Sequence, residues 1–108
     1  MLFKSVFVVF VLLVLSVGVV SAEYRFKDGT KIEVQWYEKA GQILNENVCF
    51  NYQDDKRQYP QCRKKAVDYF KEECKFYKHK IKTTQQKYRQ MYQPEMEKFC
   101  TAAETYKP

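Results

Sequence analysis

Four cysteines limit the folds open to this chain more than any other feature of its sequence: Cys49, Cys62, Cys74 and Cys100. An even number of cysteines in a short secreted chain predicts disulfides rather than free thiols. A zinc site is the alternative, but the sequence has no C-x-x-C pair, and its one histidine, His79, lies between two lysines whose charge would repel a cation. We therefore expect two disulfides and no metal or other cofactor.

The first 22 residues have the pattern of a secretory signal peptide. Lys4 precedes an apolar run over residues 6–20, and small residues end the run. Val20 and Ala22 occupy the two positions at which a signal peptidase requires small residues, so we expect cleavage before Glu23. The alternative is an uncleaved membrane anchor, but the run is barely long enough to span a bilayer. We therefore predict a signal peptide over residues 1–22 and a secreted protein with no transmembrane anchor.

Residues 23–108 then form a single small domain, of a size at which a hydrophobic core alone gives marginal stability. All three serines of the sequence lie in the leader, and the rest of the chain has one histidine and two glycines. A Ser/His nucleophile, a glycine-rich phosphate loop and a histidine metal site are therefore excluded. We predict that the protein is not an enzyme.

Two patterns compete at the start of this domain. Asp28 and Gly29, flanked by alternating residues, are a hairpin signal. Thr30, however, begins a capping box. Apolar residues also recur at helical spacing: Ile32, Trp36, Ala40, Ile43 and Leu44. Because this apolar stripe is longer than the strand signal, we predict a helix over residues 31–47. Gly41 lies inside this range, where glycine destabilises a helix by about 1 kcal/mol relative to alanine.

Two further helices follow a polar loop over residues 50–59. Pro60 suits the first turn of a helix, and apolar residues then recur every three or four positions as far as Met91. Thr83 and Gln86 form a second capping box, which favours a turn there over a break at Pro94. We predict helices over residues 60–82 and 84–106, with a kink at Pro94.

Helix geometry selects the disulfide pairing. Cys62 and Cys74 on one helix lie about 18 Å apart, whereas the Cα atoms of a disulfide lie within about 7 Å. If the chain turns near residues 83–87, Cys74 and Cys100 lie on neighbouring antiparallel helices at similar distances from the turn. Measured along the helix axes, these distances are about 14 Å and about 18–20 Å. We predict Cys49–Cys62 and Cys74–Cys100, with Cys49–Cys74 and Cys62–Cys100 left as the alternative. The resulting fold class is all-α: a small disulfide-stapled three-helix bundle with up-down-up topology.

Positive charge is concentrated in the middle of the chain. The net charge is −3 over residues 23–55, +9 over residues 56–89 and −1 over residues 90–108. On a continuous helix, six cations fall within about 40° of one line: Lys64, Lys71, Lys75, Lys78, Lys82 and Arg89. This basic ridge lies opposite the apolar face. One interpretation is a binding site for an anionic partner, and the other is a solvated helix surface.

The dibasic pair Lys56-Arg57 has two interpretations as well. Prohormone-processing proteases cut at such pairs in exposed loops, and a cut here would leave two chains joined by disulfides. The other interpretation, which the polarity and exposure of loops favour, is two solvated loop charges.

These features predict a secreted, non-enzymatic, cationic protein that binds an extracellular or host macromolecule, as toxins, effectors and signalling ligands do. We expect the partner to be an acidic protein, a sulfated glycan or a phospholipid surface, and not nucleic acid. One alternative is a carrier whose aromatic side chains surround an apolar ligand, and another is a membrane-active cationic peptide.

Overall fold

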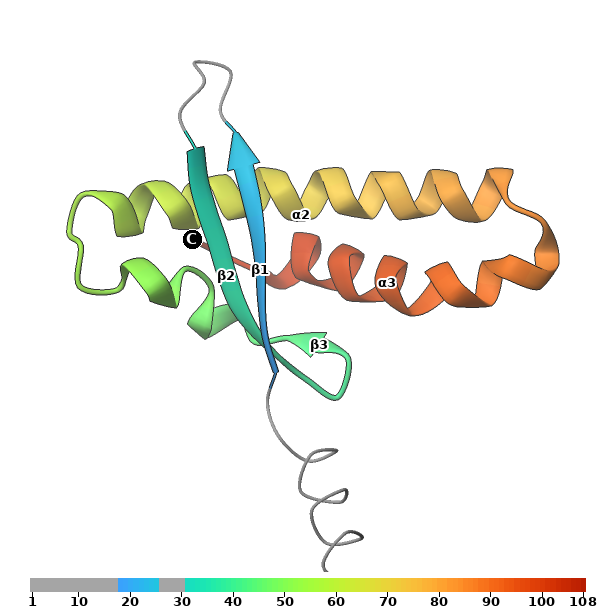
Figure 1. Ribbon diagram of the computed structural model, residues 1–108, viewed down its shortest axis with the longest axis horizontal. Helices are drawn as coiled ribbons and strands as arrows, with labels where there is room; N and C mark the ends of the chain where they lie inside the picture. The colour runs from blue at the N-terminus through green and yellow to red at the C-terminus, as the bar shows by residue number, and fades with distance from the viewer. Residues whose placement is uncertain (1–17, 26–30) are drawn as a thin grey trace, which may run out of the picture.

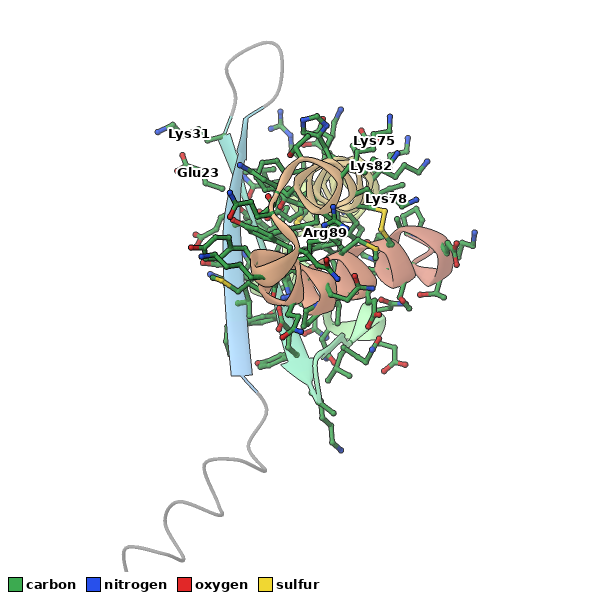
Figure 2. The ribbon with its side chains drawn as sticks, turned by 90° about the vertical axis from the view of Figure 1, so that its right-hand side faces the viewer. Glu23, Lys31, Lys75, Lys78, Lys82 and Arg89 are labelled. Carbon is green, nitrogen blue, oxygen red and sulfur yellow. A yellow bond between two sulfur atoms is a disulfide. The ribbon has the colours of Figure 1, made fainter. Side chains whose placement is uncertain are left out.

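The structure is a computed structural model that describes residues 18–25 and 31–108. Its elements are strands β1 (Gly18–Arg25), β2 (Lys31–Lys39) and β3 (Gln42–Ile43), the short 3-10 helices η1 (Asn45–Asn47) and η2 (Phe50–Tyr52), and helices α2 (Gln58–Thr83) and α3 (Gln86–Thr105). The strands form an antiparallel sheet in the order β1-β2-β3, which crosses one face of the α2–α3 hairpin (Figures 1 and 2). The prediction of an all-α three-helix bundle is therefore wrong.

The predicted helix over residues 31–47 is replaced by β2, β3 and η1. In β2 the side chains alternate, so that Ile32, Val34 and Trp36 are buried while their neighbours are half-buried or exposed. The helical interpretation left out Val34, which lies off the helical stripe and is 0% exposed. A stripe with a period of two, rich in β-branched residues, is a strand signal, and it outweighs the weaker helical spacing.

The turn between β2 and β3 explains Gly41, which is unfavourable inside a helix. Ala40 and Gly41 both have positive φ, at 52° and 75°. Two consecutive left-handed residues are what a tight type I′ hairpin requires, and glycine adopts this conformation without a steric penalty. The other hairpin signal, at Asp28 and Gly29, and the proposed cap at Thr30 lie outside the described residues.

The two long helices lie close to the predicted ranges, and the chain turns between them at Thr84 and Gln85. Asp55 caps α2, because its Oδ1 accepts hydrogen bonds from the backbone N–H groups of Arg57 and Gln58 at 3.0 and 2.9 Å. The predicted capping box at Thr83 is absent: the Thr83 hydroxyl donates instead to the carbonyl of His79. Pro94 lies inside α3, which continues through it without a break.

The core lies where the sheet meets the helices. The Trp36 ring from β2 packs edge-on against Phe70 of α2 and Phe99 of α3, with centroids 5.7 and 6.2 Å apart. The hairpin extends past β1 toward its turn, beyond the area that the sheet covers (Figure 1). Tyr88 and Met91 end the apolar pattern that begins after Pro60, and this pattern predicts that they are buried. They lie instead on α3 and are 45% and 67% exposed.

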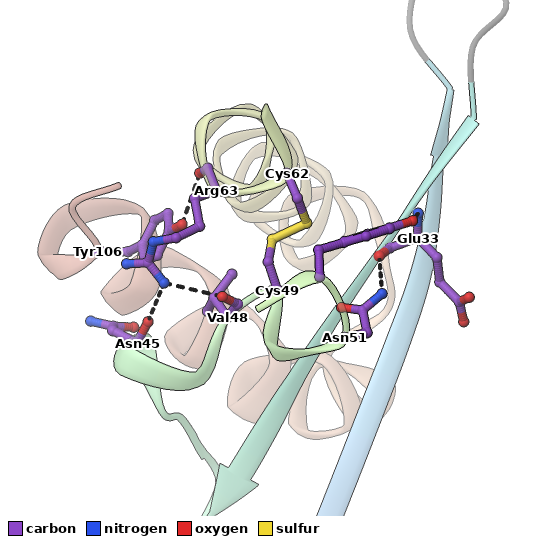
Figure 3. Close-up of a disulfide and its surroundings, with 9 residues drawn as sticks. Glu33, Asn45, Val48, Cys49, Asn51, Cys62, Arg63 and Tyr106 are labelled. Atoms are coloured by element: carbon purple, nitrogen blue, oxygen red, sulfur yellow. Dashed lines mark hydrogen bonds between the residues drawn. A yellow bond between two sulfur atoms is a disulfide. The ribbon is translucent and has the colours of Figure 1, made fainter. Parts of the chain in front are cut away.

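Both disulfides have the predicted pairing. Cys49–Cys62 joins the segment after β3 to the first turns of α2, and Cys74–Cys100 joins the two helices. Beside the first disulfide, the Arg63 guanidinium donates to the carbonyl of Val48 at 3.1 Å, and the Tyr106 hydroxyl donates to the carbonyl of Arg63 at 2.8 Å (Figure 3). The first contact holds the segment after η1 against α2, and the second holds the residue that follows α3.

The predicted leader overlaps the sheet. Residues 1–17 lie outside the described residues, but residues 18–22 form the first five positions of β1. They pair with residues 34–38 of β2. Cleavage at the predicted site would therefore remove five of the eight residues of β1.

Candidate anion-binding face on helix α2

The basic ridge is divided between two helices. Five of its six members lie on α2, and all five are exposed: Lys64, Lys71, Lys75, Lys78 and Lys82. We call these five residues the lysine face. Arg89 lies on α3, where its Nε donates to the carbonyl of Thr84 at 3.2 Å. Figure 2 shows Lys75, Lys78 and Lys82 on the side of α2 that points away from the sheet.

The lysine face is straight because α2 is one unbroken helix of 26 residues. The buried residues of α2, such as Ala66 and Phe70, lie on the opposite side, against the sheet and α3. At 1.5 Å per residue, Lys64 and Lys82 lie about 27 Å apart along the helix axis. The fold therefore presents a row of ammonium groups on a rigid support.

The ion pairs of the described residues involve other lysines. Lys31 pairs with Glu23 at 3.2 Å on the outer side of the sheet, and Lys98 pairs with Glu38 and Glu95. Among the carboxylates of α2, the exposed Asp68 lies nearest to the line of the lysine face, about 40° from Lys64 around the helix. The lysine face therefore keeps a concentrated positive charge that is open to solvent.

A second charged cluster, which sequence reasoning missed, lies between β2 and α3. The Lys98 ammonium is 3.2 Å from Glu38 Oε2 and 2.9 Å from Glu95 Oε2, and the Trp36 indole N–H donates to Glu38 at 2.8 Å. Burial lowers the pKa of Lys98, but the hydrogen bonds to Glu95 and Glu38 more than offset this, so its pKa is raised overall. Only the Glu95–Lys98 spacing along one helix is visible in the sequence, and it does not reveal the contact with β2.

Tyrosines next to this cluster are held in their neutral form. Burial, reinforced by the nearby carboxylate of Glu73, raises the pKa of Tyr69, and burial together with Glu95 and Glu73 raises the pKa of Tyr77. These groups therefore stay protonated at neutral pH. They contribute ring packing at the helical hairpin rather than charge.

The aromatic rings that would surround a ligand in a carrier lie against one another: Trp36, Phe70, Tyr77 and Phe99. Tyr77 stacks on Phe99 at 5.8 Å, and Trp36 packs against both Phe70 and Phe99.

Within the described residues, no group of three or more His, Cys, Asp or Glu side chains is arranged to hold a metal ion.

The dibasic pair lies just before α2, and both side chains are exposed. The Cys49–Cys62 disulfide spans it with a sequence separation of 13. A cut after Arg57 would leave the two resulting chains covalently joined.

None of the helices in the described part of the chain has the length and hydropathy needed to cross a membrane.

No protein-family model, curated protein or solved structure matches this chain.

Proposed function

We propose that this protein is a secreted, non-enzymatic, disulfide-stabilised protein that binds an anionic extracellular macromolecule through the lysine face of α2. The observation that carries the proposal is the exposure of all five lysines on one side of a single rigid helix. The two disulfides are typical of proteins that fold in an oxidising compartment.

A linear sulfated glycan is the partner best suited to this geometry. A row of cations about 27 Å long can contact several successive sulfates of an extended polyanion without any change in the helix. Charges held on a preorganised support lose less conformational entropy on binding than charges on a mobile segment. The sheet and α3 cover the opposite side of the helix, so the lysine face is open to a long ligand.

The proposal is tested by measuring the affinity of the oxidised protein for a heparin oligosaccharide at physiological ionic strength. One variant removes most of the lysine face by replacing four of its lysines with glutamine: Lys71, Lys75, Lys78 and Lys82. If each exposed charge contributes about 0.5 kcal/mol, the affinity falls by about 30-fold. Binding of the unaltered protein weakens as salt is added, because exposed charges are screened.

The matched control removes the same number of charges elsewhere. It replaces four exposed cations outside the face with glutamine: Lys39, Lys56, Arg57 and Lys107. We expect this control to retain most of the affinity, whereas equal losses in both variants would mean that only net charge matters. Vesicles of anionic phospholipid form the second arm. Tighter binding to vesicles than to heparin would assign the face to a lipid surface instead.

A further inference from the structure

One edge of β2 is covered by residues that the predicted cleavage removes. Residues 18–22 of β1 pair with residues 34–38 of β2, and a signal peptidase that cuts before Glu23 takes all five away. The rest of β1, residues 23–25, pairs only with residues 31–33. Cleavage therefore turns residues 34–38 into an edge strand with unpaired backbone groups.

The backbone groups on this edge belong to alternate residues of β2. On the opposite side of the strand, the carbonyl of Gln35 accepts a hydrogen bond from Cys49 at 2.7 Å, and that of Tyr37 accepts one from Leu44 at 2.9 Å. Successive residues of a strand direct their backbone groups to opposite neighbours. The N–H and C=O groups of Val34, Trp36 and Glu38 therefore face β1.

Side chains of the covering segment complete the core. Val20 and Ala22 pack against it from positions opposite Trp36 and Val34, whereas Val19 points outward and is 58% exposed. Removal of the segment therefore exposes an apolar strip as well as the strand edge. A strand that replaces it needs small apolar side chains at alternate positions, and tolerates polar ones between them.

We propose that, in the secreted chain, residues 34–38 of β2 bind an extended peptide segment of a partner protein whose alternate residues are small and apolar. The inference rests on the leader removal that the proposed secretion entails, but it does not depend on the lysine face. Five residues of strand accommodate a segment about 17 Å long.

A second copy of the chain fits this edge poorly. The α2–α3 hairpin extends past β1 on one face of the sheet (Figure 1). Two copies joined antiparallel through β2 would place both hairpins on the same face of the common sheet, where they would collide. A separate extended segment has no such obstruction.

The test uses the oxidised chain that begins at Glu23 and a capped peptide, Gly-Val-Val-Ser-Ala, with the sequence of residues 18–22. Trp36 is the only tryptophan in the sequence, so its fluorescence reports binding at this edge. We expect a saturable blue shift, and protection of the Val34, Trp36 and Glu38 amides from hydrogen exchange. A chain that begins at Gly18 should show neither effect, because its own strand occupies the edge.

Two altered peptides separate strand addition from nonspecific binding. Val20→Lys places a charge on the core side and should lower the affinity at least about tenfold, whereas Val19→Lys lies on the outer side and should change it by less than about twofold. Equal binding of both altered peptides, binding to the chain that begins at Gly18, or no binding to a folded chain would each overturn the proposal. So would N-terminal sequencing that finds residues 18–22 on the secreted protein.

If the chain that begins at Glu23 does not fold alone, the peptide should restore its two disulfides and helical circular dichroism during oxidation. Failure to do so would equally overturn the proposal. A dimer of the chain that the peptide dissociates would assign the edge to a second copy and overturn the assignment to a partner protein. Heparin affinity measured on the same samples reports the lysine face separately.

Discussion

Lys98 of α3 and Glu38 of β2 form an ion pair across the interface between helix and sheet, although they are sixty residues apart in the sequence. Their charged atoms lie 3.2 Å apart, and the two side chains are only 9% and 19% exposed. The pair is extended by Glu95 and by the indole of Trp36. It connects the sheet to the helical hairpin at the edge of the aromatic core.

Replacing Lys98 by methionine should lower the free energy of unfolding by about 3 kcal/mol, because Glu38 would keep a largely buried charge without its partner. Denaturant unfolding followed by circular dichroism measures this change. Lys31→Met is the matched control, since the Lys31–Glu23 pair is more than half exposed. It should cost less than about 1 kcal/mol. Equal effects of the two substitutions would contradict a stabilising role for the buried pair.

Alkaline pH should destabilise the protein. Burial raises the pKa of Tyr106 to about 12, although the nearby Arg63 guanidinium lowers it, and the pKa values of Tyr69 and Lys98 are raised as well. A group whose pKa is raised on folding contributes stability that is complete below its unfolded pKa, which is about 10 for both residue types. The free energy of unfolding should therefore be level from about pH 7 to 9 and fall above about pH 10.

The measurement is a series of denaturant curves across this pH range, together with the phenolate absorbance of the native protein. Tyr106 should ionise only near pH 12, and in Tyr106→Phe the part of the phenolate titration at high pH should shrink. Simultaneous ionisation of all tyrosines in the native protein would contradict the burial of this hydroxyl.

Val34 tests whether residues 31–39 form a strand. Its side chain is 0% exposed, and Val34→Ala should cost about 2 kcal/mol of unfolding free energy. The adjacent Gln35 is on the other face of the sheet, and Gln35→Ala should cost less than about 0.5 kcal/mol. In a helix over residues 31–47, Val34 would lie off the apolar stripe. A negligible effect of Val34→Ala would then favour the helix.

Asp68→Asn should strengthen the binding of a heparin oligosaccharide by about two- to threefold. Among the acidic side chains of α2, Asp68 lies nearest to the line of the lysine face, and its replacement by asparagine takes away a repulsive charge. Isothermal titration calorimetry measures the change. Glu104→Gln, on an exposed position of α3, changes the net charge equally and should leave the affinity unaltered.

The helical hairpin could be predicted from the sequence because its information is local. The apolar residues at positions 62, 66, 70 and 74 recur every four positions, as on one face of a helix. Cys74 and Cys100 lie at similar distances from the turn between the helices, which predicts their disulfide. The strand of residues 31–39 carried its own local signal in Ile32, Val34 and Trp36, and the longer helical stripe concealed it. The lysine alignment on α2 followed from the same periodicity.

Other features depend on contacts that no local pattern encodes. Glu38 lies on the face of β2 that points toward the core. Lys98 contacts it only because α3 packs on the sheet. Arg89 appears in line with the lysines on a continuous helix, but the turn at Thr84 and Gln85 places it on α3. Likewise, the overlap between the predicted leader and β1 becomes visible only once the strand pairing is known.

Lysine acetylation footprinting with and without a bound heparin oligosaccharide locates the binding face on the protein. Mass spectrometry measures the rate of modification at each lysine of the oxidised protein. We predict protection of four lysines of the lysine face: Lys71, Lys75, Lys78 and Lys82. The rates should be unchanged at three exposed lysines elsewhere: Lys31, Lys39 and Lys107. Uniform protection of all lysines, or protection confined to residues outside α2, would contradict this prediction.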